Sequence, residues 1–281
     1  MFEGLHLGLN PLLEFDLVKV PKIVEHDEEP DRIKFDDFKK FAYDLHFKKC
    51  LDSRIFVDEF VNSASVDSWN LWYRNILLKT INNAVPITTF NKFLNQSHQQ
   101  KYLIPILKCP KPNPNKPASY AGEYLVDEFI AGERVLSVLS VTSKRILLFN
   151  EQGARIQNTN LSILSSMLPY LSNDVIIDGV FNGERYYAFD ITLLEDFINN
   201  NQQHSQKTRH TVLCDMQDLL VELFDGKIRI LPKKLITVTT GCEIESAKDE
   251  FRSQGATKCV IKDVNGVYST KTKPNWFIEV L

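Results

Sequence analysis

The residues best suited to chemistry lie where extended segments meet turns. The stretch YLVDEFIAGERVLSV, residues 124–138, reads as a strand, a tight turn and a second strand, with Gly132 at the bend and Arg134 just after it. Turns of this kind commonly carry binding and catalytic groups. Here, however, the positions suited to a nucleophile and a partner carboxylate hold Phe129 and Ala131. The stretch is therefore either an active site or only the framework of one.

Two later stretches combine strands, turns and aromatic or charged side chains in a similar way. They are DVIIDGVFNGERYYAFDI at 174–191 and CVIKDVNGVYSTKTKPNWFIEV at 259–280. With FIAGER preceding them, they resemble the nucleotide-binding motifs of phage-type ATP-dependent DNA ligases, members of the covalent nucleotidyltransferase superfamily. The segment WNLWYRNILLKTINNAVPITTFNKFL, followed by IPILKC, resembles the region that precedes the adenylation domain in those ligases. The resemblance covers residues 35–281.

The resemblance implies a lysine that attacks ATP and carries AMP as a phosphoramide, which is nucleophilic catalysis. In the family's first motif, K-x-D-G-x-R, this chain has Phe129 in place of the lysine and Ala131 in place of the aspartate, whereas Gly132 and Arg134 match. Further residues that would touch phosphate or metal are also replaced: Glu151 for the arginine of an S-R-N-G-like turn, Val180 for the glutamate of D-G-E, Thr257 for the glutamate of E-G-x-V-x-K, and Ile278 and Val280, with Glu279 between them, for the lysines of W-x-K-x-K.

Phosphoryl transfer depends on positioning and on neutralising charge, so these replacements favour a catalytically inactive protein, a pseudoenzyme of phage origin. The prediction is no catalytic residue, no metal site and no cofactor; ATP and Mg²⁺ are implied only if the ligase works through an unconventional site. Arg134, Phe189 and Lys262 match the family pattern and are candidate vestigial nucleotide-binding residues. The alternative is that Phe189 lines a pocket wall while Arg134 and Lys262 pair with nearby Asp or Glu.

The elements that must position these residues follow from the spacing of apolar side chains. Helical spacing covers 35–47, 66–81 and 86–96, and the capping candidates are Asp67 or Ser68 and Thr88 or Thr89. From 123 onward the spacing is that of strands, predicted over 123–129, 134–140, 145–149, 174–181, 185–191, 258–263, 266–270 and 276–281, with helices over 160–171, 208–224 and 244–254.

This pattern predicts an α+β protein with four parts. They are an acidic and apolar arm at 1–30, a helical domain like the ligase N-terminal domain at 31–107, a Pro- and Asn-rich linker at 108–122, and an adenylation-like domain at 123–281. The last is predicted to be an antiparallel-sheet domain of the nucleotidyltransferase, ATP-grasp-like ligase kind, with no OB-type domain after it. The apolar residues of the arm are expected to dock on the body or on a protein partner.

Composition excludes some classes of protein. The 281 residues are 43% hydrophobic and 25% charged, which is typical of globular proteins. The sequence has no apolar run long enough to span a membrane and no signal peptide pattern at its start. Its five cysteines form no C-x-x-C pair, which argues against zinc and for a reducing compartment. The expected location is therefore the cytoplasm, that of the host cell if a phage encodes the protein.

Charge is unevenly distributed. Ten acidic and four basic groups give residues 1–37 a net −6, so the remainder carries +3 of the overall −3. Basic residues interleaved with apolar ones are predicted to contact nucleic acid weakly and without sequence preference: Lys227, Arg229, Lys233, Lys234, Lys271 and Lys273, with Lys207, Arg209 and His210 nearby. Two alternatives stay open: a working ligase or nucleotidyltransferase with an unconventional site, and an assembly component that contacts a partner through residues 1–30.

Overall fold

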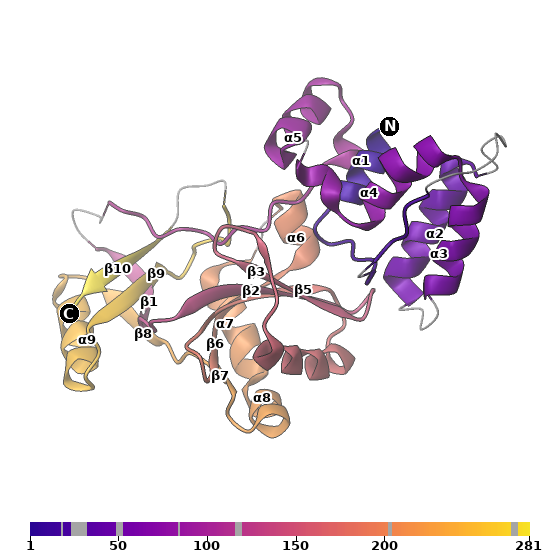
Figure 1. Ribbon diagram of the computed structural model, residues 1–281. Coiled ribbons are helices and arrows are strands. Elements are labelled where there is room, and N and C mark those ends of the chain that lie inside the picture. The colour runs from indigo at the N-terminus through magenta and orange to yellow at the C-terminus, as the bar shows by residue number, and fades with distance from the viewer. Residues whose placement is uncertain are drawn as a thin grey trace. The chain divides into compact units, whose positions relative to one another are not determined.

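The computed structural model describes residues 1–17, 19–23, 33–48, 53–83, 85–115, 120–201, 204–270 and 275–281. They form two compact units, Met1–Pro105 and Ile106–Leu281. The first is helical and the second contains the two β-sheets, so the α+β class and the antiparallel sheets are confirmed (Figure 1). Among these residues, no helix is both long enough and apolar enough to cross a membrane.

Short helices build the first unit. They are α1 (Phe2–Leu9), α2 (Phe35–Lys48), α3 (Ser53–Ser63), the π-helix η1 (Ser68–Tyr73), α4 (Arg74–Leu77), the 3₁₀ turns η2 (Thr80–Asn83) and η3 (Gln100–Tyr102), and α5 (Ile87–Gln96). Helix α5 begins after Pro86 and has no side-chain cap, so the prediction of a cap at Thr88 or Thr89 is wrong. Proline suits this start because it needs no N–H partner and its φ is already fixed.

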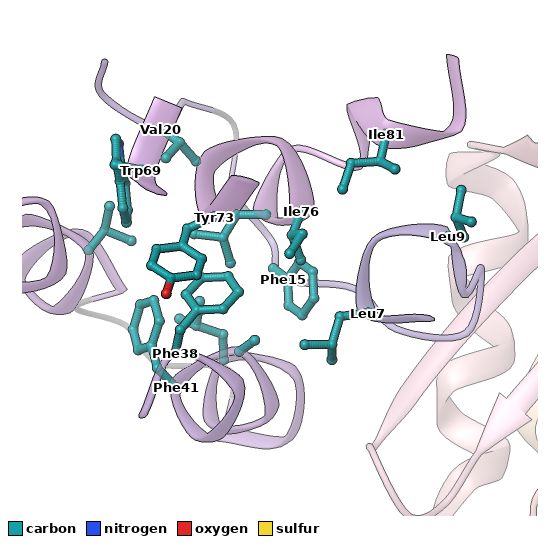
Figure 2. Packing of buried hydrophobic residues seen from close by; sticks show 14 of the residues in the cluster. Leu7, Leu9, Phe15, Val20, Phe38, Phe41, Trp69, Tyr73, Ile76 and Ile81 are labelled. Carbon is teal, nitrogen blue, oxygen red and sulfur yellow. The ribbon is translucent and has the colours of Figure 1, made fainter. Parts of the chain in front are cut away.

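The core of this unit is aromatic, as the helical spacing predicts (Figure 2). The rings of Phe38 and Tyr73 stack with centroids 4.2 Å apart, and Trp69 is completely buried. Trp72 follows Trp69 by three residues, a spacing that places two side chains on one face of an α-helix, yet it is 44% exposed. Both Trp69 and Trp72 lie in the π-helix, where hydrogen bonds join residues five apart, so the α-helical spacing used for the prediction does not hold.

The N-terminal segment is part of this core rather than a free arm. Leu7, Phe15 and Val20 are buried against the helices, and the indole Nε1 of Trp69 donates a hydrogen bond to the Pro21 carbonyl at 2.8 Å (Figure 2). The apolar residues predicted to dock on the body or on a partner therefore dock on their own unit. The acidic stretch 24–32 lies outside the described residues.

Two sheets organise the second unit. The four-stranded sheet has the order β10-β9-β1-β8 and the six-stranded sheet the order β4-β3-β2-β5-β6-β7; all neighbours are antiparallel except β6 and β7. The strands are β1 (Gly122–Glu128), β2 (Glu133–Ser140), β3 (Arg145–Asn150), β4 (Arg155–Ile156), β5 (Val175–Phe181), β6 (Tyr186–Leu193), β7 (Ile228–Ile230), β8 (Lys234–Val238), β9 (Lys258–Asp263) and β10 (Trp276–Val280).

The turn between β1 and β2 does not form a hairpin, because the two strands belong to different sheets. Residues 129–132 instead carry the chain from one sheet to the other. Gly132 passes so close to β5 that an added Cβ would lie 2.5 Å from the Phe181 carbonyl oxygen. Glycine is therefore needed at this crossing for close backbone approach.

The remaining helices are η4 (Thr159–Tyr170, 3₁₀), α6 (Leu194–Asn199), α7 (Gln206–Asp215), α8 (Gln217–Phe224) and α9 (Cys242–Ser253). The single helix predicted over 208–224 is two helices, α7 and α8. The strand predicted over 266–270 is wrong, because Val267 makes only an isolated bridge with Ser205. Strand β8 was not predicted. It begins with a lysine in a basic stretch, and only its last three residues alternate between buried and exposed, with Ile236 and Val238 buried.

Candidate functional site

A pocket of about 330 Å³ lies in the second unit, and both sheets line it. Strands β1, β9 and β10 contribute from the four-stranded sheet, and β2, β5 and β6 from the six-stranded sheet. The crossing segment 129–132 also lines it. Arg134, Phe189 and Lys262, predicted from three separate motifs, all lie in its wall. The fold thus brings these candidates to one place.

Phe129 lines the pocket at the position that the resemblance assigns to the lysine nucleophile. Its N–H donates to the Lys258 carbonyl at 3.1 Å, and the Lys258 Nζ lies 5.3 Å from the centre of its ring. A phenyl ring has no lone pair with which to attack phosphorus. Among the described residues that line the pocket, the single lysine is Lys262.

Arg134 is held by partners within the protein. Its Nε and Nη2 donate to the two carboxylate oxygens of Asp178 at 3.0 and 2.6 Å, and its Nη1 donates to the Pro110 carbonyl at 2.7 Å. The Tyr268 hydroxyl donates to the same carboxylate at 2.7 Å. Burial alone would lower the pKa of Arg134, but the Asp178 carboxylate more than offsets this, and the pKa is raised. Both members of this pair therefore have their hydrogen bonds satisfied.

Arg209 forms a second satisfied pair, with Asp190. The two guanidinium–carboxylate hydrogen bonds measure 2.7 and 3.2 Å, and the two side chains are 4% and 5% exposed. Burial would raise the pKa of Asp190, but the charge and hydrogen bonds of Arg209 lower it to about 2. The prediction that Arg209 faces nucleic acid is wrong, because α7 packs on β6 and places this arginine inside.

Asp127 lies in a different environment. Its Oδ2 is 3.6 Å from the Nζ of Lys262 and 3.9 Å from the Nζ of Lys233, and neither of its carboxylate oxygens has a hydrogen bond. The Asp127 side chain is only 1% exposed. This carboxylate is therefore buried beside two amines without the hydrogen bonds that normally accompany such burial.

Lys233 is an interior residue. Its side chain is completely buried, and its ammonium donates to the Phe189 carbonyl. Burial, followed by the nearby charge of Lys262, lowers its pKa to about 7. The prediction that Lys233 contacts nucleic acid is therefore wrong, because a side chain without solvent exposure cannot reach a phosphate backbone.

Phe189 is in contact with cations. The Nζ of Lys262 lies 4.5 Å from the centre of its ring, and the guanidinium carbon of Arg134 lies 5.3 Å from it and 5.4 Å from the Trp276 ring. Cation–π contacts at these distances are favourable. Arg134 and Lys262 thus combine contacts to aromatic rings with ion pairs to Asp178 and Asp127, as expected from the alternative to nucleotide binding. Whether a nucleotide binds stays a prediction.

Three residues that replace the family's phosphate or metal contacts line the pocket, namely Glu151, Val180 and Ile278, and Glu128 lines it beside them. No ion pair to either glutamate is found within the described ranges. Glu279, by contrast, pairs with Lys248 at 3.2 Å and accepts from the Tyr120 hydroxyl at 2.9 Å. It is absent from the pocket wall because alternate residues of β10 face opposite sides, and Ile278 takes that place.

The predicted nucleic-acid residues of the described part of the chain are divided between the two sheets. Lys227 and Arg229 are exposed at β7, an edge strand of the six-stranded sheet. Lys234 begins β8, an edge strand of the other sheet, and its ammonium pairs with Glu250. Lys271 and Lys273 lie outside the described residues. Thr257, which replaces a metal-binding glutamate of the family, is exposed.

A nucleoside triphosphate with its metal does not fit these residues. Both arginines of the pocket are hydrogen-bonded to aspartates, Lys262 lies beside Asp127, and two further carboxylates line the wall. Across the described residues, no group of three or more His, Cys, Asp or Glu side chains could hold a metal ion. Within the part of the wall that the structure describes, each cation therefore has a carboxylate partner, and none is free to neutralise the charge on which phosphoryl transfer depends.

Comparison with known proteins supports the fold. No protein-family model and no curated protein matches the chain. Two solved structures, described as "Pmar-Lig_Pre." and "Pmar-Lig_PreS3", match 100% of this chain and 70% of theirs at 21% sequence identity, with TM-scores of 0.56 and 0.54. The ATP-dependent DNA ligase from bacteriophage T7, in complex with ATP, matches 60% of this chain and 68% of that one at 12% identity and a TM-score of 0.44. The chain has the fold of the ligase nucleotidyltransferase domain.

Three pocket residues carried no usable signal in the sequence. Gln206 and Tyr268 line the pocket from α7 and from the segment after β9. Gln206 lies outside the stretches that resemble the ligase family, and Tyr268 lies within the stretch 259–280 but matches no motif position and falls in a segment predicted as a strand. Arg209 was grouped with its basic neighbours, because the pairing with Asp190 across α7 and β6 is visible only in three dimensions.

Proposed function

We propose that the protein is a ligase-fold pseudoenzyme: it keeps the adenylation-domain framework, does not transfer adenylate, and acts by binding. One observation carries the proposal. Phe129 lies at the nucleophile position of a pocket whose arginines are already bonded to Asp178 and Asp190. The described wall therefore offers a triphosphate neither a lysine at the nucleophile position nor a cation that is free of a carboxylate partner.

The test is incubation of the full chain with α-labelled ATP and Mg²⁺ or Mn²⁺, followed by detection of acid-labile label on the denatured protein. We expect no label, while an active ATP-dependent DNA ligase treated in parallel becomes labelled. Stoichiometric transfer to any lysine, including Lys262 in the described pocket wall, would overturn the proposal. It would establish the alternative, a ligase or nucleotidyltransferase with an unconventional site.

Restoring the first motif is not expected to restore ligation. The double variant Phe129→Lys, Ala131→Asp still has Glu151 and Ile278 in the pocket wall. Like charges near a bound anion cost on the order of 1 kcal/mol or more each at intermediate dielectric. Phe129→Leu serves as the matched control without a nucleophile. Efficient sealing of a nicked duplex by the double variant would contradict the proposal.

Weak, sequence-independent nucleic-acid binding is the second part of the proposal, supported by the exposed Lys227 and Arg229. Fluorescence anisotropy on nicked and intact duplexes at two salt concentrations tests it. Reversing both charges (Lys227→Glu, Arg229→Glu) should reduce the log–log salt slope by about 0.9 for each phosphate that the protein no longer neutralises. Reversal of the paired Lys234 is the control. If the wild-type chain shows no binding at low salt, the nucleic-acid part fails.

A protein partner is the remaining alternative. The apolar residues of 1–23 are packed within the helical unit, so they do not support this alternative. Deletion of residues 1–30 is accordingly a poor test, because it removes buried core residues such as Leu7 and Phe15. Phage origin and a cytoplasmic location stay predictions.

A further inference from the structure

Two buried polar groups of the pocket have no hydrogen-bond partner within the described structure. They are the carboxylate of Asp127, at both of its oxygens, and the amide nitrogen of Gln206. Their residues are 1% and 5% exposed, and both line the pocket. A buried polar group without a hydrogen-bond partner is unfavourable, because it has lost its bonds to water. Two such groups in one wall indicate that a ligand supplies the partners: a donor for Asp127 and an acceptor for Gln206.

The charges of the wall define which ligand is compatible. The charged residues in the described part of the lining are three cations (Arg134, Arg209 and Lys262) and four anions (Asp127, Glu128, Glu151 and Asp190). Both arginines are hydrogen-bonded to carboxylates of the protein. In the described part of the wall, a phosphate group would therefore meet the half-buried Glu151, with the exposed Glu128 nearby, and no arginine free of a carboxylate partner. These described residues disfavour an anionic ligand.

The rest of the wall suits a flat apolar body. Phe129, Phe189 and Trp276 provide aromatic surface, and Ile130, Val180, Leu231, Val260 and Ile278 provide aliphatic surface. The volume of about 330 Å³ is at the lower end of the range for small-molecule sites, roughly 300–1,000 Å³. A small planar heterocycle with hydrogen-bonding edges suits this pocket. Its faces would pack on the apolar wall, and its edges would offer a donor to Asp127 and an acceptor to Gln206.

We propose that this pocket binds an uncharged nucleoside and discriminates against its phosphorylated forms, a preference opposite to that of a site that uses ATP. Asp127 accepts a hydrogen bond from an N–H or O–H of the ligand, and Gln206 donates to one of its nitrogen or oxygen acceptors. Glu151 and Glu128 exclude the phosphates. The inference rests on the proposed function in one respect, since a pocket without adenylyl transfer has no need for a triphosphate.

The test is calorimetric titration of the full chain with adenosine, guanosine, cytidine and uridine, and with the 5′-mono- and triphosphate of each, in EDTA and again in Mg²⁺. At least one nucleoside should bind, and its triphosphate should bind about tenfold more weakly or worse in EDTA, as expected for repulsion by two carboxylates. Failure of all four nucleosides to bind would overturn the inference, and so would a triphosphate that binds as tightly as its nucleoside.

Variants separate recognition from folding. Asp127→Asn and Gln206→Leu should each weaken nucleoside binding by about tenfold, the size of one hydrogen bond to a charged or buried group, with the circular dichroism spectrum unchanged. Glu151→Gln is the matched control: it should strengthen triphosphate binding and leave nucleoside binding unchanged. If Glu151→Gln changes both equally, the assignment of phosphate exclusion is wrong.

The two proposals fail in different ways. If ATP binds best and no label is transferred, the nucleoside inference fails and the pseudoenzyme proposal stands. If label is transferred, the pseudoenzyme proposal fails, and the ranking of nucleoside against triphosphate is read from the unlabelled titrations in EDTA.

Discussion

The pocket has two kinds of buried carboxylate. Asp178 and Asp190 each accept two hydrogen bonds from an arginine, and Asp178 accepts a third from Tyr268. Asp127 accepts none, and the nearest amines lie 3.6 and 3.9 Å from it. The hydrogen bonds of the first kind are complete within the protein, whereas the second kind has neighbouring amines but no hydrogen bond, although it is also buried.

The difference separates stability from binding. Burial of a charge is costly unless hydrogen bonds and an opposite charge compensate it. Asp178 and Asp190 have that compensation, so they hold β5 and β6 to β2 and α7. Asp127 has an incomplete set, which leaves its oxygens for a molecule that enters the pocket. Variants of the two kinds should therefore behave in opposite ways.

The largest effect is expected from Arg134→Ala. Within the described residues, it leaves the buried Asp178 carboxylate with the Tyr268 hydroxyl as its remaining side-chain donor. Breaking a buried pair in this way typically costs about 3–5 kcal/mol. Urea unfolding followed by circular dichroism measures the loss. Arg252→Ala, which removes an exposed helical pair with Asp249, is the control and should cost about 0.5 kcal/mol or less. A loss below about 1 kcal/mol for Arg134→Ala would contradict the structural role.

An intermediate effect on the free energy of unfolding is expected when the pH is lowered. Because the folded-state pKa of Asp190 is about 2, below its usual value of 3.8, the pair with Arg209 contributes stability that is fully present above pH 3.8. That stability is lost as the pH falls through 2. A shift of this size corresponds to about 2 kcal/mol. The wild type should therefore exceed Asp190→Asn in unfolding free energy at neutral pH, and the gap should close between pH 4 and pH 2.

His210 adds a second pH range over which the free energy of unfolding falls. Burial, followed by the charges of Lys233 and Lys262, lowers its pKa to about 4 from the usual 6.5. Its neutral form therefore contributes stability that is lost as the pH falls from 6.5 through 4. His210→Gln should remove the loss of stability between pH 6.5 and pH 4 and leave the loss that is due to Asp190.

The prediction for Asp190 has its own contradicting outcome. If the unfolding free energies of wild type and Asp190→Asn run parallel from pH 7 to pH 2, the pair with Arg209 adds no stability.

Local patterns predicted the elements better than they predicted the pairings. Alternation of apolar residues located β1, β2, β3, β5, β6, β9 and β10, because each strand has its own local pattern. The turn at Gly132 was recognised, yet it connects two sheets rather than two neighbouring strands, since pairing depends on partners far along the chain. The π-helix placed Trp72 outside because its hydrogen-bond spacing differs from that of an α-helix.

The candidate site shows the same limit. The motif resemblance brought Arg134, Phe189 and Lys262 to one pocket, because each occupies a defined place on a strand. The motif resemblance could not reveal that the Lys233 side chain is completely buried while that of the next residue, Lys234, is exposed. Two adjacent lysines look alike in the sequence, whether or not both side chains reach solvent. Gln206 lines the pocket from a segment outside the motif-like stretches, and Tyr268 lines it from between two motifs of the stretch 259–280.

The smallest effect on stability, and the sharpest test of the comparison, is expected from Asp127→Asn. The isosteric amide breaks no hydrogen bond, since neither carboxylate oxygen has one. It removes attraction to Lys262 and Lys233 at 3.6 and 3.9 Å, but at pH 8 much of Lys233 is neutral, because its pKa is about 7. The cost of burying the carboxylate is relieved at the same time.

The net change should therefore be below about 1 kcal/mol, in contrast to about 3 kcal/mol or more for Asp178→Asn, the same substitution in a satisfied pair. Both variants are unfolded in urea at pH 8, and both are titrated with the nucleoside that binds the wild type. Asp127→Asn should retain stability and lose affinity. If instead it destabilises the protein as much as Asp178→Asn does, Asp127 is a structural residue, and its unpaired oxygens have no bearing on a ligand.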